Sequence, residues 1–147
     1  MNRADVTDAI LVAKRSKSLS WSDLARTLGT SKEWSTAALL GQMSLTKSQA
    51  EAIGAQLGLA AEAVSLLQEV PYKGSLPAAV PTDPLIYRFY ELVNVYGTTL
   101  KALIHEEFGD GIMSAIDFRM SITREPDSKG DRVNIAMSGK FLPYKTY

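Results

Sequence analysis

Residues 83–123 read DPLIYRFYELVNVYGTTLKALIHEEFGDGIMSAIDFRMSIT and contain a change of period that decides the fold of the second half of the chain. Asp83 and Pro84 are typical of a helix start, because aspartate is a favoured N-cap and proline suits the first helical turn. After them, apolar residues recur every three to five positions, which predicts one long helix ending at the Gly109-Asp110-Gly111 segment. The recurring residues are Leu85, Phe89, Leu92, Tyr96, Leu100, Leu103 and Phe108.

After this helix the period becomes two, which predicts a strand from Ile112 to Thr123 with Ser114 on the same face as Ile112 and Ile116. A second strand is expected after a loop at residues 125–131, and the tail adds Tyr147. One helix and two strands are a poor independent fold, because an isolated hairpin is marginal in water. Its apolar face and unpaired edges need cover, and we expect a second copy of the chain to supply it.

The first half shows five short apolar-periodic segments, and the middle three each have a start signal and a stop signal of a helix. The start signals are Ser20 with Asp23, Ser31, and Thr46 with Gln49; the stop signals are Gly29, Gly41 and Gly58. These signals predict an all-α five-helix bundle. Within it, a helix-turn-helix resembling those of phage-repressor-type domains is indicated by the pattern of Leu24, Ala25, Leu28, Gly29, Ser31, Ala37 and Leu40.

Prolines and a glycine crowd residues 71–84 and mark a domain boundary, because they interrupt regular structure. We therefore expect a helical repressor-like domain at residues 1–70, a linker at 71–82, and an oligomerisation domain at 83–147, which also contains the residues considered below as candidates for catalytic chemistry. The fold class is α+β, with a hairpin that completes its sheet by intertwined dimerisation.

The 147 residues include 16 basic and 16 acidic side chains, one histidine and no cysteine. Without cysteine, thiolate nucleophiles, disulfides and cysteine-ligated metals are excluded, and the lone His105 excludes a multi-histidine metal site within one chain. No apolar run has the length of a secretory signal or a membrane span, so we expect a cytoplasmic protein with no membrane partner.

The helix-turn-helix outline raises an alternative function, a DNA-binding regulator with a C-terminal dimerisation and anion-sensing domain. DNA binding needs cations that neutralise phosphates. Residues 1–70, however, carry seven basic and seven acidic side chains, and the candidate recognition helix offers Lys32 beside Glu33, then mostly alanine and leucine. These residues favour a packing or assembly domain, and we expect no nucleic-acid partner.

Three residues are candidates for chemistry. Arg88 and Glu91 lie three positions apart on one face of the long helix, among aromatic residues. Such a pair is ordinarily a solvated ion pair, but a guanidinium near an interface can bind a planar anion through two parallel hydrogen bonds. Ser114 is expected to face packed structure, so its hydroxyl needs a partner; no G-x-S-x-G motif surrounds it.

Several segments together resemble the cyanase (cyanate hydratase, or cyanate lyase) family. They are PTDP (81–84), YRFYE (87–91), YGTTLKAL (96–103), HE (105–106), FGDGI (108–112) and SAI (114–116), with AALLG (37–41) in the first half and GK (139–140) and LP (142–143) near the end. The resemblance spans essentially the whole chain. It departs at Ser75, where some members have cysteine.

The resemblance implies bicarbonate-dependent decomposition of cyanate to ammonia and carbon dioxide through carbamate. It places the catalytic arginine, glutamate and serine of the family on Arg88, Glu91 and Ser114. It also implies no metal or organic cofactor, bicarbonate as co-substrate, and a homodecamer built as a pentamer of dimers, in which arginine and serine can come from different chains.

Overall fold

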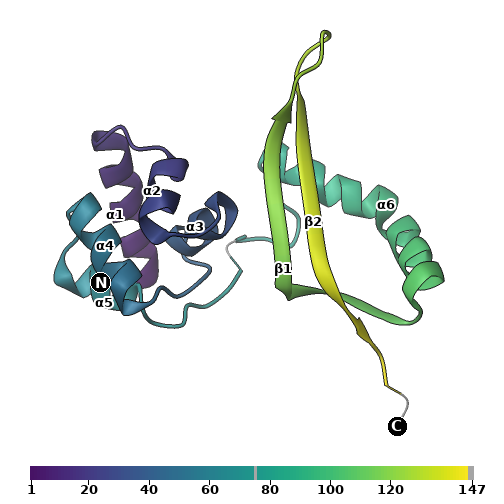
Figure 1. The fold of residues 1–147 in the computed structure, drawn as a ribbon, viewed down its shortest axis with the longest axis horizontal. Helices are drawn as coiled ribbons and strands as arrows, with labels where there is room; N and C mark the ends of the chain where they lie inside the picture. The colour runs from purple at the N-terminus through teal and green to yellow at the C-terminus, as the bar shows by residue number, and fades with distance from the viewer. Residues whose placement is uncertain (75, 146–147) are drawn as a thin grey trace. The chain divides into compact units, whose positions relative to one another are not determined.

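The computed structural model describes residues 1–74 and 76–145, so Ser75 and Tyr147 lie outside the described residues. The chain divides into two compact units, Met1–Ser75 and Leu76–Tyr147, and each unit is described here by itself. Figure 1 shows the helical first unit and the helix-and-hairpin second unit.

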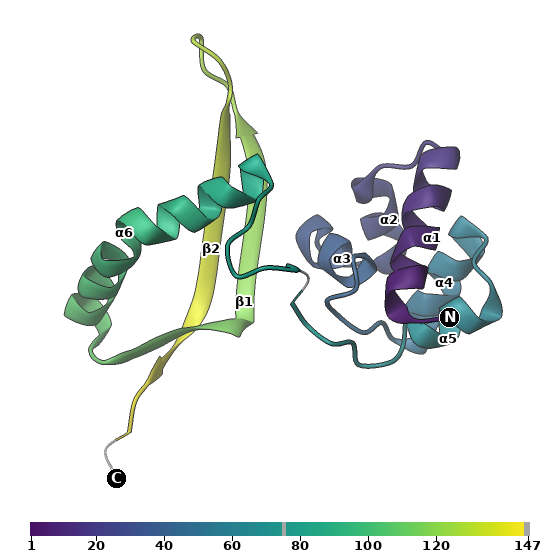
Figure 2. The same ribbon diagram turned by 180° about the vertical axis from the view of Figure 1, so that it is seen from behind.

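The first unit consists of five helices, as the sequence predicts. They are α1 (Arg3–Ser16), α2 (Trp21–Leu28), α3 (Lys32–Leu39), α4 (Lys47–Leu57) and α5 (Ala61–Leu66), and Figure 2 shows them from behind. Their buried faces form one apolar core. Its largest fully buried apolar side chains are Ile10, Leu24, Leu39, Ile53, Leu67 and Val6.

The predicted helix starts and stops are present. In α2 the Ser20 hydroxyl oxygen accepts a hydrogen bond from the backbone N–H of Asp23 at 3.1 Å, and the Asp23 carboxylate accepts one from the N–H of Ser20 at 2.7 Å. Hydrogen bonds from the Ser20 hydroxyl and N–H hold the pKa of Asp23 below its usual value. Thr46 and Gln49 repeat this capping box in α4. Gly29 and Gly58 end α2 and α4 in the left-handed conformation, which glycine adopts without steric cost.

The second unit contains one long helix, α6 (Pro84–Phe108), and two antiparallel strands, β1 (Gly111–Glu125) and β2 (Arg132–Pro143). Asp83 caps α6, because its carboxylate accepts hydrogen bonds from the N–H groups of Leu85 and Ile86, both at 2.9 Å. Near the other end of the helix, the His105 Nε2 lies 3.2 Å from the carbonyl oxygen of Gly111. This contact connects the last turn of α6 to the first residue of β1.

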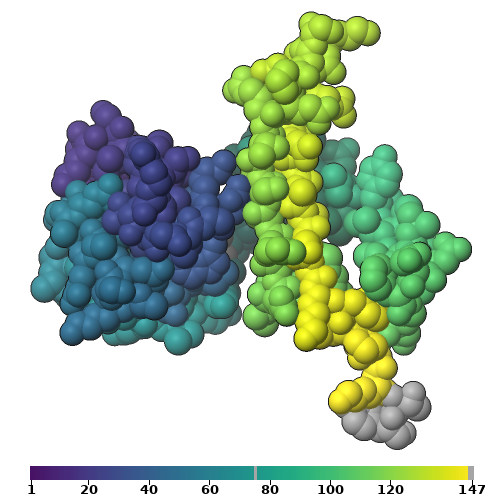
Figure 3. All heavy atoms as spheres, viewed as in Figure 1, coloured from purple at the N-terminus to yellow at the C-terminus, as the bar shows by residue number. Residues whose placement is uncertain are grey.

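The apolar residues of α6 are not covered. None of its residues, all of which the structure describes, is buried. The seven large apolar side chains that recur along it are between 47% and 69% exposed. The hairpin likewise displays apolar side chains along its strands, which lie side by side in the space-filling view of Figure 3. One chain therefore leaves bare the apolar surface that the sequence analysis expects a second copy to cover.

The predicted strict alternation in the first strand is wrong over residues 114–117. Gly111 to Met113 pair with Pro143 to Phe141, and the regular pairing resumes only with Phe118 opposite Gly139. The intervening residues of β1 face Lys140 alone and form a bulge. Ser114 is consequently 7% exposed and Ile116 is 95% exposed, so the two do not share a face.

The contact between α4 and α5 yields a testable prediction. A Cβ atom at Gly54 would overlap the Cγ2 of Val64, whose β-branched side chain has little freedom to turn away. Gly54→Ala should therefore lower the free energy of unfolding by about 1–3 kcal/mol, although alanine favours helix over glycine. The measurement is the unfolding midpoint by circular dichroism. Adding Val64→Ala should recover part of the loss, and a midpoint raised by Gly54→Ala alone would contradict the packing argument.

Candidate functional site

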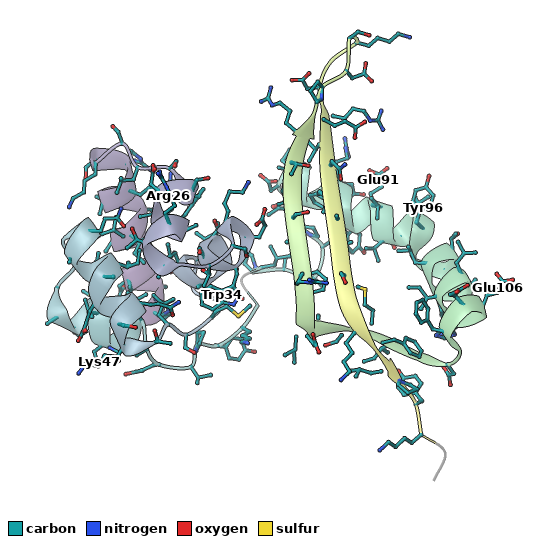
Figure 4. The ribbon with its side chains drawn as sticks, in the orientation of Figure 1. Arg26, Trp34, Lys47, Glu91, Tyr96 and Glu106 are labelled. Atoms are coloured by element: carbon teal, nitrogen blue, oxygen red, sulfur yellow. The ribbon has the colours of Figure 1, made fainter. Side chains whose placement is uncertain are left out.

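The first two candidate residues lie early in α6, where the cap fixes the start of the helix. Arg88 and Glu91 are one turn apart, and the Arg88 Nη1 lies 3.2 Å from the Glu91 Oε2. Both side chains are largely in solvent, with exposed fractions of 69% and 51%. Tyr87 and Tyr90 directly precede Arg88 and Glu91 in the sequence, and the centroids of their rings are 5.9 Å apart. Figure 4 shows the side chains of this helix, with Glu91 labelled.

An ion pair so exposed contributes little to stability, on the order of a few tenths of a kcal/mol. The pair is of interest instead for the hydrogen-bond donors that Arg88 keeps free. One guanidinium nitrogen of Arg88 bonds Glu91, which leaves the other donors of the planar fork unpaired among the described residues. A guanidinium of this kind can bind a planar anion through two parallel N–H donors. The pair thus leaves guanidinium donors that could bind an anion.

The third candidate, Ser114, lies in the bulge of β1. Its hydroxyl oxygen accepts hydrogen bonds from the backbone N–H of Ile116 at 3.1 Å and of Asp117 at 3.0 Å. The expectation that this buried hydroxyl needs a partner is therefore confirmed. The partners belong to its own strand rather than to another packed element.

The structure brings Arg88 and Glu91 together and leaves Ser114 apart from them. Over residues 1–74 and 76–145, no hydrogen bond or ion pair joins Ser114 to either residue of the helix. A single described chain therefore holds two incomplete parts of the predicted site, one on α6 and one on β1.

The sequence analysis missed an open hollow beside the bulge. It has a volume of about 530 Å³ and is lined by residues 116–119 of β1 and 138–140 of β2. Its charged residues are Arg119, Lys140 and Asp117, so it carries a small positive excess. Gly139 within an apolar strand pattern is the one signal that could have indicated it, because a glycine inside a strand often marks a bulge or a close backbone approach.

Among the described residues, no group of three or more His, Cys, Asp and Glu side chains is placed to hold a metal ion. In the same part of the chain, no helix combines the length and apolar character needed to cross a membrane.

Comparison with known proteins assigns both halves of the chain. The family described as "Cyanate hydratase, N-terminal" matches residues 3–71, and "Cyanate lyase C-terminal domain" matches residues 78–146. The cyanate hydratase of Ralstonia pickettii (strain 12J) is 73% identical over 147 residues, which are 100% of both chains. This chain belongs to the cyanate lyase family.

Other members of the cyanate lyase family are similar over the same length. The cyanate hydratase of Dechloromonas aromatica (strain RCB) is also 73% identical over 100% of both chains. The crystal structure of cyanase from T. urticae matches with a TM-score of 0.81 and 41% identity, covering 94% of this chain and 96% of that one. The resemblance noted in the sequence is confirmed, as is the α+β fold class with N-terminal helices, a long helix and a hairpin.

Proposed function

We propose that this protein decomposes cyanate in a bicarbonate-dependent reaction. The observation that supports cyanate as substrate is the full-length match to cyanate hydratases. In the proposed reaction bicarbonate adds to the cyanate carbon, and the adduct loses carbon dioxide to leave carbamate. Carbamate then separates into ammonia and a second carbon dioxide. Two protons are taken up for each cyanate consumed, so the reaction needs groups that manage both charge and protons.

The central physical difficulty is that both reactants are anions. At about 4 Å they repel by roughly 1 kcal/mol in bulk water and about 4 kcal/mol at an effective dielectric constant near 20. The chain has a formal net charge of zero, so its overall field does not attract them. A local cation is required, and the exposed guanidinium of Arg88 is well suited to hold the anions in attack geometry. Such positioning can remove roughly 7–11 kcal/mol of barrier in the best cases.

Glu91 and Ser114 take supporting roles in this proposal. Glu91 would repel two anions unless paired, and its bond to Arg88 supports an orienting role, with proton transfer to the departing nitrogen as the alternative role. Ser114 donates its hydroxyl to an oxygen or nitrogen of the bound anions, where charge shifts during addition.

We further propose that the complete site lies between subunits. The uncovered apolar residues of α6, and the separation of Ser114 from Arg88, support an intertwined dimer that contributes the two residues from different chains. Five such dimers would make a homodecamer, as the family resemblance implies. The site would use bicarbonate as co-substrate, with no metal or organic cofactor.

We also propose that the protein is cytoplasmic and has no membrane or nucleic-acid partner. The family match favours the enzyme over the DNA-binding regulator. The equal numbers of acidic and basic side chains in residues 1–70 point the same way.

The role of Arg88 can be tested by Arg88→Lys, which keeps the charge but removes the planar fork. We expect the fold and assembly to persist and kcat for ammonia release from cyanate to fall by about 100-fold or more. The matched control is Arg124→Lys, because Arg124 also forms an exposed ion pair, with Asp131 at 2.8 Å. Near-normal turnover in Arg88→Lys would refute the anion-binding role.

The addition step predicts a strict need for bicarbonate. In buffer freed of carbon dioxide, ammonia release from cyanate should fall to the uncatalysed rate, and added bicarbonate should restore it in a saturable manner. Undiminished turnover without bicarbonate would remove the addition step and leave simple hydrolysis.

The shared site predicts that activity resides in a large assembly. Light scattering should give a mass of about 160 kDa, ten times the 16.0 kDa of one chain. Dilution or mild denaturant that releases subunits should abolish activity in parallel with the loss of mass. A stable, active monomer would overturn the shared-site proposal.

A further inference from the structure

The bulge in β1 determines which hydrogen bonds Ser114 has left to make. A serine hydroxyl has one proton to donate and two lone pairs that accept. The N–H groups of Ile116 and Asp117 supply two donors to Ser114 Oγ, at 3.1 and 3.0 Å. Both acceptor positions are therefore occupied. Within the described part of the chain, no acceptor for the Ser114 proton lies within hydrogen-bond distance.

A hydroxyl in this state is a donor only. It cannot accept a hydrogen bond from an N–H or O–H of a ligand without losing one from its own strand. The two bonds that it receives also polarise its O–H group, which strengthens the bond that it donates. Such a group favours an anionic oxygen or nitrogen over a neutral ligand that presents donors, such as an amide.

Gly139 of β2 allows the two strands to lie close together at Ser114, because it has no side chain. A Cβ atom at position 139 would overlap the carbonyl oxygen of Ser114 and the side chain of Met113. The carbonyl is part of the backbone, so it cannot rotate away as a flexible side chain could. The φ of Gly139 is not in the left-handed region, so the requirement is one of close approach rather than of backbone conformation.

The strand pairing around Gly139 shows how its close approach to Ser114 affects the hydrogen bonds of the serine. Gly139 lies opposite Phe118, where regular pairing resumes after residues 114–117. A larger residue at 139 would push the Ser114 backbone outward at the edge of the bulge. Because Ser114 Oγ is held by the N–H groups two and three residues further along, such a shift would break the bonds that occupy its lone pairs.

We propose that Gly139 is a positioning residue for the reaction: by allowing β2 to approach the Ser114 carbonyl, it keeps the Ser114 hydroxyl as a donor-only group directed to an anionic ligand. The ligand rests on the function proposed above, whereas the hydrogen-bond arrangement rests on the strand geometry alone. The tests therefore include one readout that does not depend on cyanate turnover.

The first test is a double-mutant cycle of Gly139→Ala and Ser114→Ala, measured as kcat and KM for cyanate in saturating bicarbonate. Gly139→Ala should lower kcat by about 100-fold, the loss typical of a misplaced catalytic group. The double variant should be no slower than Ser114→Ala, because the glycine acts through the serine. Multiplied losses in the double variant would show independent effects and overturn the proposal.

The control variant is Ser138→Ala, which changes the neighbouring exposed residue of β2 and adds no atom. It should retain kcat, and its mass by light scattering should equal that of the unmodified protein. If Gly139→Ala fails to assemble while Ser138→Ala assembles, Gly139 serves assembly, and the positioning role is overturned.

The second test is residue-resolved hydrogen exchange of the intact assembly. Ile116 and Asp117 have no partner in the strand pairing, so their amides owe protection to Ser114 Oγ. Ser114→Ala should speed their exchange at least about 10-fold, as loss of a hydrogen bond of about 1.4 kcal/mol would, and leave the paired amides of residues 119–122 unchanged. Unchanged exchange at 116 and 117 would overturn the donor-only arrangement. An unmodified protein inactive toward cyanate, with the exchange result intact, would instead refute only the proposed function.

Discussion

The apolar residues of α6 have no cover within their own chain, and this constraint shapes the rest of the second unit. A helix of 25 residues with no buried side chain is unfavourable in water, because fully burying a large apolar side chain gains roughly 1.5–3 kcal/mol and these side chains forgo part of that gain. The two-stranded hairpin is equally incomplete, since among the described residues its strands pair only with each other. The first unit, by contrast, buries its own core. The proposed assembly would therefore cover the half of the chain that carries all three candidate site residues.

The same constraint explains how an exposed ion pair can become a site. In water, a solvated arginine binds a small anion weakly, because water competes for every donor and screens the charge. Enclosing the Arg88–Glu91 pair between subunits would remove that water and strengthen the guanidinium's attraction for anions. Glu91 would then prevent the guanidinium from being buried as an unpaired charge. Assembly and catalysis would therefore depend on the same surface, and weakening one would weaken the other.

The bulge of β1 orients the Ser114 hydroxyl as a hydrogen-bond donor, which a regular strand would not do. In a regular strand the backbone N–H groups bond the neighbouring strand and are not available to a nearby serine. Residues 114–117 leave the pairing, which frees the N–H groups of Ile116 and Asp117 to bond the Ser114 oxygen. The strand thereby gains a buried, oriented donor while its pairing continues on both sides.

Some of these features are local, and the sequence alone predicts them. The caps at Ser20 and Thr46, the start of α6 at Asp83, and the proximity of Arg88 to Glu91 each depend on residues within one helical turn. The strand face of Ser114, by contrast, was not predicted correctly from the sequence. Period two predicted a face shared with Ile116, and this prediction failed because the strand pairing is interrupted by a bulge at residues 114–117, where the Gly139 backbone lies close to the Ser114 carbonyl across the hairpin. Residue spacing records how side chains repeat along one segment, whereas the closeness of two backbones depends on how distant segments pair, and only the tertiary structure decided that.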